Sequence, residues 1–178
     1  MRAVVVYESM YGATHLIANA IGKGLSEAGE VTVVRVGSTL TADAAAADLV
    51  VVGGPTHVHT MSRPSSRRSA AQGAANPGSP YTLEPQAEGI GVREWLEGLT
   101  AAPGQAAAFD TRIDLNPVMT GRASKGIAKQ LHKHGMQLVA PPESFLVTKA
   151  GDLVDGEEER AVEWGRHRAA AVAGVPQA

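Results

Sequence analysis

The chain has 178 residues, which is long enough for one domain with a sizeable core. Its formal net charge of −2 excludes a broad field that would recruit nucleic acid or an anionic membrane. The absence of cysteine excludes disulfides, thiolate chemistry and thiolate metal sites. With no signal-peptide pattern and no long apolar run, we expect a cytoplasmic domain over residues 1–173, followed by a short tail at 174–178.

Apolar runs predict the strands of a parallel sheet that is covered on both faces. The fifth strand is interrupted by Pro141-Pro142, and a proline pair is excluded from a central ladder, so this strand is either split or at the sheet edge. The predicted strands are Ala3–Tyr7, Val31–Val36, Asp48–Gly53, Ala106–Ile113, and 137–140 together with 144–148.

Helical patterns separate these strands. They cover Thr14–Ala28, Val92–Leu99, Ala123–His134 and a last segment after Asp155. Such alternation predicts an α/β fold: a doubly wound five-stranded parallel sheet, strand order 2-1-3-4-5, with helices on both faces.

One region, at about residues 57–90, interrupts the alternation as a long insertion. Ser62 could cap a helix that starts at Pro64 and runs to Ala75. Residues 76–89 are rich in proline and glycine and predict a loop.

The turn after the first strand, Ser9 to Thr14, predicts a binding site for a phosphate. In this sheet order ligands bind at the carboxyl ends of strands one and three. The turn leads into a helix N-terminus, whose free N–H groups attract an anion. Ser9 and Thr14 add hydroxyl groups, and Gly12 lets the backbone approach a ligand closely. Turn and capping roles for Ser9 and Thr14 remain an alternative.

Three other phosphate sites are excluded by the residues present. A Walker loop needs Gly-Lys followed by Ser or Thr, and a dinucleotide fold needs G-x-G-x-x-G, and neither occurs at this turn. A phospho-receiver domain needs an aspartate at the end of strand three, where this chain has Gly53-Gly54-Pro55-Thr56.

The same stretch resembles the FMN-binding motif of the flavodoxin family. The matching positions are Val5, Val6, Tyr7, Ser9, Gly12, Thr14, Ala18 and Ile21. The resemblance extends over nearly the whole chain and implies a flavodoxin-like fold with FMN as cofactor. It places the phosphate in the turn and the flavin ring between the segments after Pro55 and after Asp110. The implied cofactor residues are Ser9, Met10, Tyr11, Gly12, Ala13, Thr14, Pro55, Thr56, His57, Asp110, Thr111 and Arg112.

The chain departs from the family pattern around the ring. Neither segment that would flank the ring carries the usual large aromatic residue, and Tyr11 and Tyr81 are the nearby aromatic residues. Arg63, Arg67 and Arg68 in the insertion could meet an acidic partner or the phosphates of a nicotinamide nucleotide. They could equally form a solvated helix face.

His57 and His59 are candidate catalytic residues. Either could donate a hydrogen bond to the flavin, or a proton during its reduction. Alternate residues of an extended segment point the same way, so the two could also form a metal pair. No carboxylate with ligand spacing accompanies them, and we expect no metal site.

Two classes of function follow. The first is an FMN-binding redox protein, either a carrier with a protein redox partner or an NAD(P)H-dependent, quinone-type reductase. The second is a flavin-less module that binds another phosphorylated ligand or a protein on the same fold. Neither requires nucleic acid or a membrane span.

Overall fold

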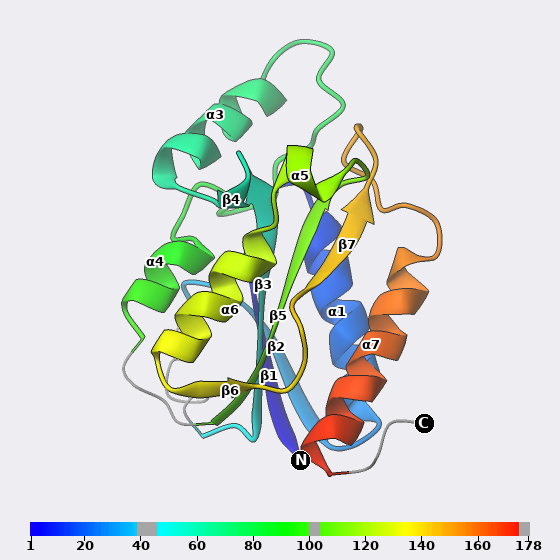
Figure 1. Cartoon of the computed structure of the whole chain (residues 1–178). Helices are drawn as coiled ribbons and strands as arrows, with labels where there is room; N and C mark the ends of the chain where they lie inside the picture. The colour runs from blue at the N-terminus through cyan, green and yellow to red at the C-terminus, as the bar shows by residue number, and fades with distance from the viewer. Residues whose placement is uncertain (39–45, 100–103, 175–178) are drawn as a thin grey trace.

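The computed structural model describes residues 1–38, 46–99 and 104–174. Its centre is a parallel sheet in the order β2-β1-β3-β5, and β6 and β7 both pair with β5 beyond it (Figure 1). The strands are β1 (Arg2–Tyr7), β2 (Glu30–Arg35), β3 (Leu49–His57), β4 (Thr60–Met61), β5 (Gly104–Ile113), β6 (Met136–Leu138) and β7 (Glu143–Val147). The predicted fold and strand order are confirmed, and the predicted fifth strand is split into β6 and β7.

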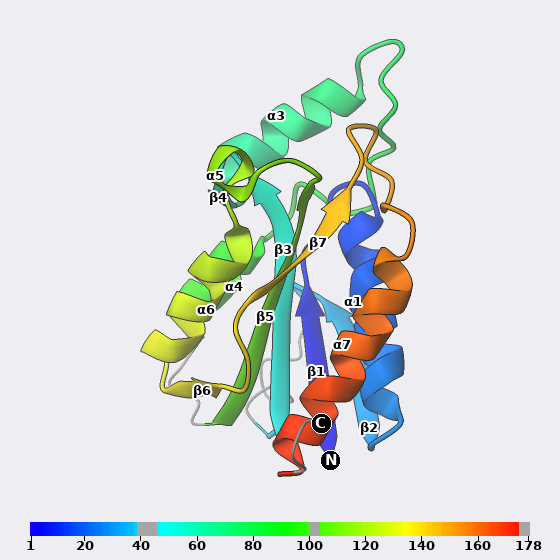
Figure 2. The same cartoon turned by 45° about the vertical axis from the view of Figure 1, so that its right-hand side comes forward.

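Helices cover both faces of the sheet, as Figures 1 and 2 show. On one side lie α1 and α7, and on the other α4 and α6. The helices are α1 (Ala13–Ser26), α3 (Pro64–Ala74), α4 (Val92–Glu97), α5 (Pro117–Thr120), α6 (Ala123–Lys133) and α7 (Glu157–Val172). Within the described ranges, none of them is both long enough and apolar enough to span a bilayer.

The two cores follow from the alternation of side chains along the strands. In β1, Val5 packs toward α1 and α7, whereas Val4 and Val6 pack toward α4 and α6. Every residue of β1 after Arg2 is buried, which explains the continuous apolar run in its sequence.

Helices α1 and α7 cross at a glycine contact. A Cβ at Gly24 would lie 2.1 Å from the carbonyl oxygen of Val162, and one at Gly165 would lie 2.5 Å from that of Ile21. Both distances are too short for real atoms, so glycine at each position allows the two backbones to touch. This contact fixes α1, and the turn that precedes it, against the C-terminal helix.

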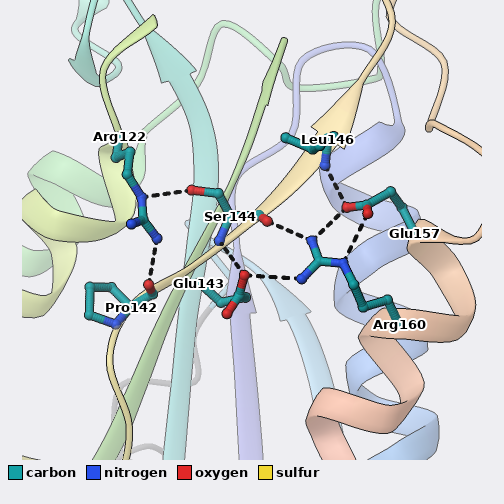
Figure 3. A network of polar contacts seen from close by, with 7 residues as sticks. All are labelled: Arg122, Pro142, Glu143, Ser144, Leu146, Glu157 and Arg160. Atoms are coloured by element: carbon teal, nitrogen blue, oxygen red, sulfur yellow. Dashed lines mark hydrogen bonds and ion pairs between the residues drawn. The ribbon is translucent and has the colours of Figure 1, made fainter. Parts of the chain in front are cut away.

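Strand β7 lies at the sheet edge. The backbone groups on its outer side are hydrogen-bonded to residues of α7 and of the segment that precedes it (Figure 3). The Ser144 carbonyl accepts a hydrogen bond from Arg160 Nη2 at 2.6 Å, and the Leu146 N–H donates to Glu157 Oε2 at 2.6 Å. The Leu146 carbonyl accepts from the Val154 N–H at 3.0 Å. An edge whose polar groups are satisfied this way offers little to a further strand.

The insertion differs in part from the prediction. It contains a short strand, β4, that pairs antiparallel with the end of β3 and was not predicted. Helix α3 begins at Pro64 as predicted, but its N-cap is Arg63 and not Ser62. The Ser62 hydroxyl instead accepts a hydrogen bond from Arg67 at 2.8 Å. Of the predicted C-terminal tail, residues 175–178 lie outside the described residues.

Candidate functional site

A cleft of about 220 Å³ opens at the carboxyl ends of β1, β3, β5 and β7. This is the edge of the sheet at which α/β folds bind ligands. The cleft is lined by Met10, Tyr11, Ala13, Thr14, Pro55, Thr56, His57, Tyr81, Thr111, Arg112, Ile113, Val147, Thr148 and Gly151.

The turn after β1 presents free backbone donors at one end of the cleft. Leu16 makes the first hydrogen bond of the helix ladder, to Gly12, so the N–H groups of residues 13–15 precede the ladder. Gly12 has φ +99°, and a Cβ there would meet no atom within 4 Å. The Ser9 hydroxyl accepts from the Gly12 N–H at 3.1 Å and fixes the shape of the turn.

Two threonines join this turn to the end of β5. The hydroxyl oxygens of Thr14 and Thr111 lie 2.7 Å apart, and both residues are buried. The contact holds the helix N-terminus at a fixed distance from the wall formed by residues 111–113. A ligand at the turn would therefore meet that wall directly.

We call residues 76–90 of the insertion the strap, because they cross the turn after β1. Tyr81 of the strap stacks on Tyr11 with ring centroids 4.5 Å apart. The Tyr81 hydroxyl donates to the Lys149 carbonyl at 2.7 Å, and the Tyr11 hydroxyl donates to the Ala70 carbonyl at 3.0 Å. The insertion thus supplies an aromatic wall that the segments after β3 and β5 lack.

Glu84 attaches the strap to the turn. Its N–H donates to the Met10 carbonyl at 2.8 Å, and its carboxylate contacts His15 Nδ1 at 2.8 Å and Arg35 Nη1 at 3.2 Å. Burial alone would raise the pKa of Glu84, but hydrogen bonds from Ser9 and His15 and the charge of Arg35 outweigh it. The net effect is a lowered pKa, so Glu84 is ionised at neutral pH.

An ion pair with a buried arginine lies close to His57. Arg67 is buried, and its Nη2 lies 3.0 Å from Glu94 Oε2. Burial, together with the charge of Arg67, lowers the pKa of His57, so its ring is neutral at physiological pH. Of the three arginines for which a partner, a nucleotide or a solvated helix face was left open, Arg67 is buried, while Arg63 and Arg68 are exposed.

The structure brings most of the predicted cofactor residues together. Nine of the twelve line the cleft: Met10, Tyr11, Ala13, Thr14, Pro55, Thr56, His57, Thr111 and Arg112. Ser9 and Gly12 shape the turn instead. His59 lies apart, at the exposed tip between β3 and β4, with φ +70°.

Asp110 does not line the cleft. Its side chain is fully buried, and Oδ2 accepts a hydrogen bond from the Ser124 N–H, in the first turn of α6, at 2.7 Å. Burial raises the pKa of Asp110. Because side chains alternate along β5, Asp110 faces away from the wall to which Thr111 belongs.

Sequence reasoning missed four lining residues, Ile113, Val147, Thr148 and Gly151. The last three reach the cleft because β7 is a separate strand that pairs with the carboxyl-terminal half of β5. Val147 ends this strand, and Thr148 and Gly151 follow it. Glu84 was also missed, and nothing in the local sequence of the strap indicates its ion pairs. Over the ranges that the structure covers, no three His, Asp or Glu side chains are grouped for binding a metal.

Comparisons with known proteins bear on the family and the fold. Residues 4–65 match the family model of the flavodoxin domain. A search of curated proteins found no significant match.

Solved structures resemble the whole chain. An archaeal flavodoxin has 21% identity and a TM-score of 0.67, covering 97% of this chain and 99% of that one. Flavodoxin 1 from Bacillus cereus has 17% identity and a TM-score of 0.63, covering 99% of this chain and all of that one.

Part of a larger enzyme also matches. Rubredoxin:oxygen oxidoreductase from Desulfovibrio gigas has 16% identity and a TM-score of 0.62, and the match covers 97% of this chain but 36% of that enzyme. The chain is therefore flavodoxin-like, in fold along most of its length and in sequence over residues 4–65.

Proposed function

We propose that this chain binds FMN in the cleft and acts as an electron-transfer protein. The observation that carries the proposal is the turn after β1. It offers free N–H groups at a helix N-terminus, beside open space at Gly12, and it opens into a cleft at the carboxyl ends of the strands. The flavodoxin-like motif and the flavodoxin neighbours support the same ligand.

The phosphate end fits the residues present. The N–H groups of Ala13 and Thr14 precede the helix ladder, where the helix dipole also favours an anion. Gly12 leaves the approach open.

Two carboxyl groups lie at the turn. Glu84 pairs with Arg35 and contacts His15. Glu8 is buried and accepts a hydrogen bond from the Val92 N–H at 2.8 Å, and burial raises its pKa, which favours its neutral form.

The cleft, at about 220 Å³, is smaller than the ~300–1,000 Å³ that is typical of ligand pockets. A flavin ring bound there would therefore keep one edge in solvent. The walls of the cleft come from Pro55–His57 and Thr111–Ile113, with Tyr11 and Tyr81 at the turn.

When bound, FMN would supply the redox chemistry, and the protein would supply position and electrostatics. His57 is the histidine among the lining residues, and its lowered pKa keeps it a neutral hydrogen-bonding partner. Arg112 Nη1 donates to the carbonyls of Ile113 and Leu115, at 3.2 and 2.7 Å, and so stiffens the opposite wall. Either a protein redox partner or NAD(P)H with a quinone would complete the reaction.

A charge placed at Ala13 tests the phosphate end. Ala13→Glu adds a carboxylate in the first turn of α1. There the helix dipole stabilises the negative charge, but the charge repels a phosphate. We expect folding stability to be kept or raised while FMN affinity falls at least ~10-fold, or ~1.4 kcal/mol. Titration by flavin fluorescence, with riboflavin alongside FMN, measures the phosphate contribution directly.

Ala13→Gln is the matched control, because it has the same size without the charge. We expect FMN to bind it more tightly than it binds Ala13→Glu, and riboflavin to bind all three proteins alike. Equal FMN affinity of the Glu and Gln variants would place the phosphate elsewhere. A chain that ignores FMN altogether would favour the flavin-less module instead.

A further inference from the structure

Five of the exposed large apolar side chains come from two neighbouring segments, the tip of the β3–β4 hairpin and residues 113–119. Seven such side chains are exposed in the described part of the chain, and the remaining two, Leu16 and Ile90, lie on α1 and in the strap. We call the five from these two segments the apolar patch: Val58, Ile113, Leu115, Val118 and Met119. Scattered single apolar residues need no explanation, but a cluster of this kind marks an interaction site.

The two segments that carry the patch lie side by side, and one of them reaches the cleft. His59, next to Val58, forms a bridge with Gly121, which ends α5. Figures 1 and 2 both show α5 beside β4, so Val58 and the residues of α5 lie at the same end. Ile113 belongs both to the patch and to the cleft wall.

The backbone conformation of Val58 lowers the stability of the fold. It lies at the tip of the β3–β4 hairpin with φ +45°, a conformation that β-branched residues rarely adopt. Its side chain is 81% exposed, so burial does not compensate for the strain. Hairpin tips of this kind favour Asn or Gly. A strained and exposed valine indicates that its side chain is kept for contact with something outside the chain.

The two segments that carry the patch are basic. Residues 55–68 and 111–125 together contain six arginines and lysines and a single acidic residue, Asp114, so their formal charge is +5. The whole chain carries −2, which leaves −7 on the remainder. Of the six, Arg67 is buried in its pair with Glu94, while Arg63 and Lys125 are exposed.

We propose that the apolar patch and the basic segments that carry it dock an acidic electron-transfer protein beside the cleft, on the side of Ile113. The redox purpose of this docking rests on the proposed function, whereas the docking itself depends only on the surface. A protein is favoured over a nicotinamide nucleotide because Val58 and Val118 project outward, and small ligands bind in concave sites. It is favoured over a membrane because the patch contains no Trp or Phe.

The test is a titration of the ¹⁵N-labelled chain without added flavin, followed by amide shifts at low ionic strength. The probes are two haem proteins of similar size and opposite charge: the soluble domain of cytochrome b5, which is acidic, and cytochrome c, which is basic. Charge complementarity acts at low salt without a specifically evolved pair. We expect cytochrome b5 to shift residues 58, 115, 118 and 119, and 0.5 M salt to abolish the shifts.

Variants separate the apolar and charged contributions. Arg63→Glu with Lys125→Glu should weaken cytochrome b5 binding at least tenfold, whereas Lys23→Glu on α1 should leave it within twofold. Val58→Asn should weaken binding about threefold or more while thermal stability is kept or raised, because the strain is relieved. Leu16→Asn is the matched control for an exposed apolar residue outside the patch.

Four outcomes would overturn the proposal. They are no shifts with cytochrome b5, equal shifts with cytochrome c, association of the chain with itself through the patch, or stronger binding to anionic vesicles than to cytochrome b5. Sedimentation velocity and co-sedimentation with phosphatidylserine vesicles measure the last two. Failure of FMN to bind is seen in the flavin titration and is thus distinguishable from failure of docking.

Discussion

Asp110 and Thr111 are neighbours with different roles, because successive side chains of a strand face opposite ways. Thr111 lines the cleft and contacts Thr14, whereas Asp110 holds the first turn of α6. The sequence places both at the end of a strand. It does not indicate which of them faces the cleft, since that depends on the register of β5 in the sheet.

Asp110→Ala should destabilise the fold by ~1–3 kcal/mol, because the Ser124 N–H would be left buried without an acceptor. Asp110→Asn keeps an acceptor and should cost much less. Neither change should alter FMN affinity more than about twofold. Urea unfolding and flavin titration of both variants provide the measurements. A large loss of FMN affinity in Asp110→Asn would show that Asp110 contributes to cofactor binding.

The raised pKa of Asp110 also makes the folding stability depend on pH in a predictable direction. A raised pKa means that the folded state holds the Asp110 proton more tightly than the unfolded chain does. Its contribution to stability is therefore greatest below about pH 4 and is lost as the pH rises through the folded pKa. The stability of Asp110→Asn relative to the natural chain should rise over that interval.

At the scale of elements, the strap is the part that the sequence describes least. Proline and glycine predict a loop over residues 76–89, and the structure has no helix or strand there. Its path over the turn after β1 is set by the Tyr81 stack and the Glu84 ion pairs, which are contacts between residues distant in sequence. By contrast, Pro141-Pro142 correctly indicates a split strand, because proline excludes ladder pairing locally.

Glu84→Gln should loosen the strap. The change removes the ion pairs to His15 and Arg35 but keeps the backbone bond to Met10. We expect hydrogen exchange of residues 81–84 to rise about 5-fold, corresponding to ~1 kcal/mol for a half-buried pair. Because the pKa of Glu84 is lowered, the natural chain should show the same loosening as the pH falls through that value.

Glu88→Gln is the matched control for the strap, since Glu88 is exposed in the same segment. Its exchange rates should equal those of the natural chain at every pH. If Glu84→Gln exchanges no faster than Glu88→Gln, the strap is held by the tyrosine stack and not by the ion pairs.

At the scale of the whole molecule, the sheet is closed at β7 by side chains of α7. Glu157→Ala with Arg160→Ala would free the Leu146 N–H and the Ser144 carbonyl. We expect stability to fall by ~1–3 kcal/mol and association to increase with concentration, because a free edge pairs with other chains. Light scattering and urea unfolding measure the two effects.

Arg166→Ala on the same helix is the control, because its ion pair with Glu27 is at the surface. It should remain monomeric wherever the natural chain does. Association of both variants to the same extent would show that the edge contacts are not responsible.

The overall arrangement of the molecule is the part best predicted from sequence. Apolar runs that alternate with helical patterns predict a parallel sheet covered on both faces, and five strands in one domain favour the doubly wound order 2-1-3-4-5. The motif from Val5 to Ile21 likewise locates the turn. The hairpin tip at Val58 could not be predicted, since a valine with positive φ contradicts local preference.

The glycine contact between α1 and α7 gives distant parts of the chain a shared response to ligand. Helix α7 contributes no residue to the cleft, yet Gly24 and Gly165 leave no space in which one helix could shift without the other. A ligand that holds the N-terminus of α1 must therefore also slow the opening of α7. Ligand binding in the cleft would therefore be detected as slower amide exchange in α7, a helix that does not contact the ligand.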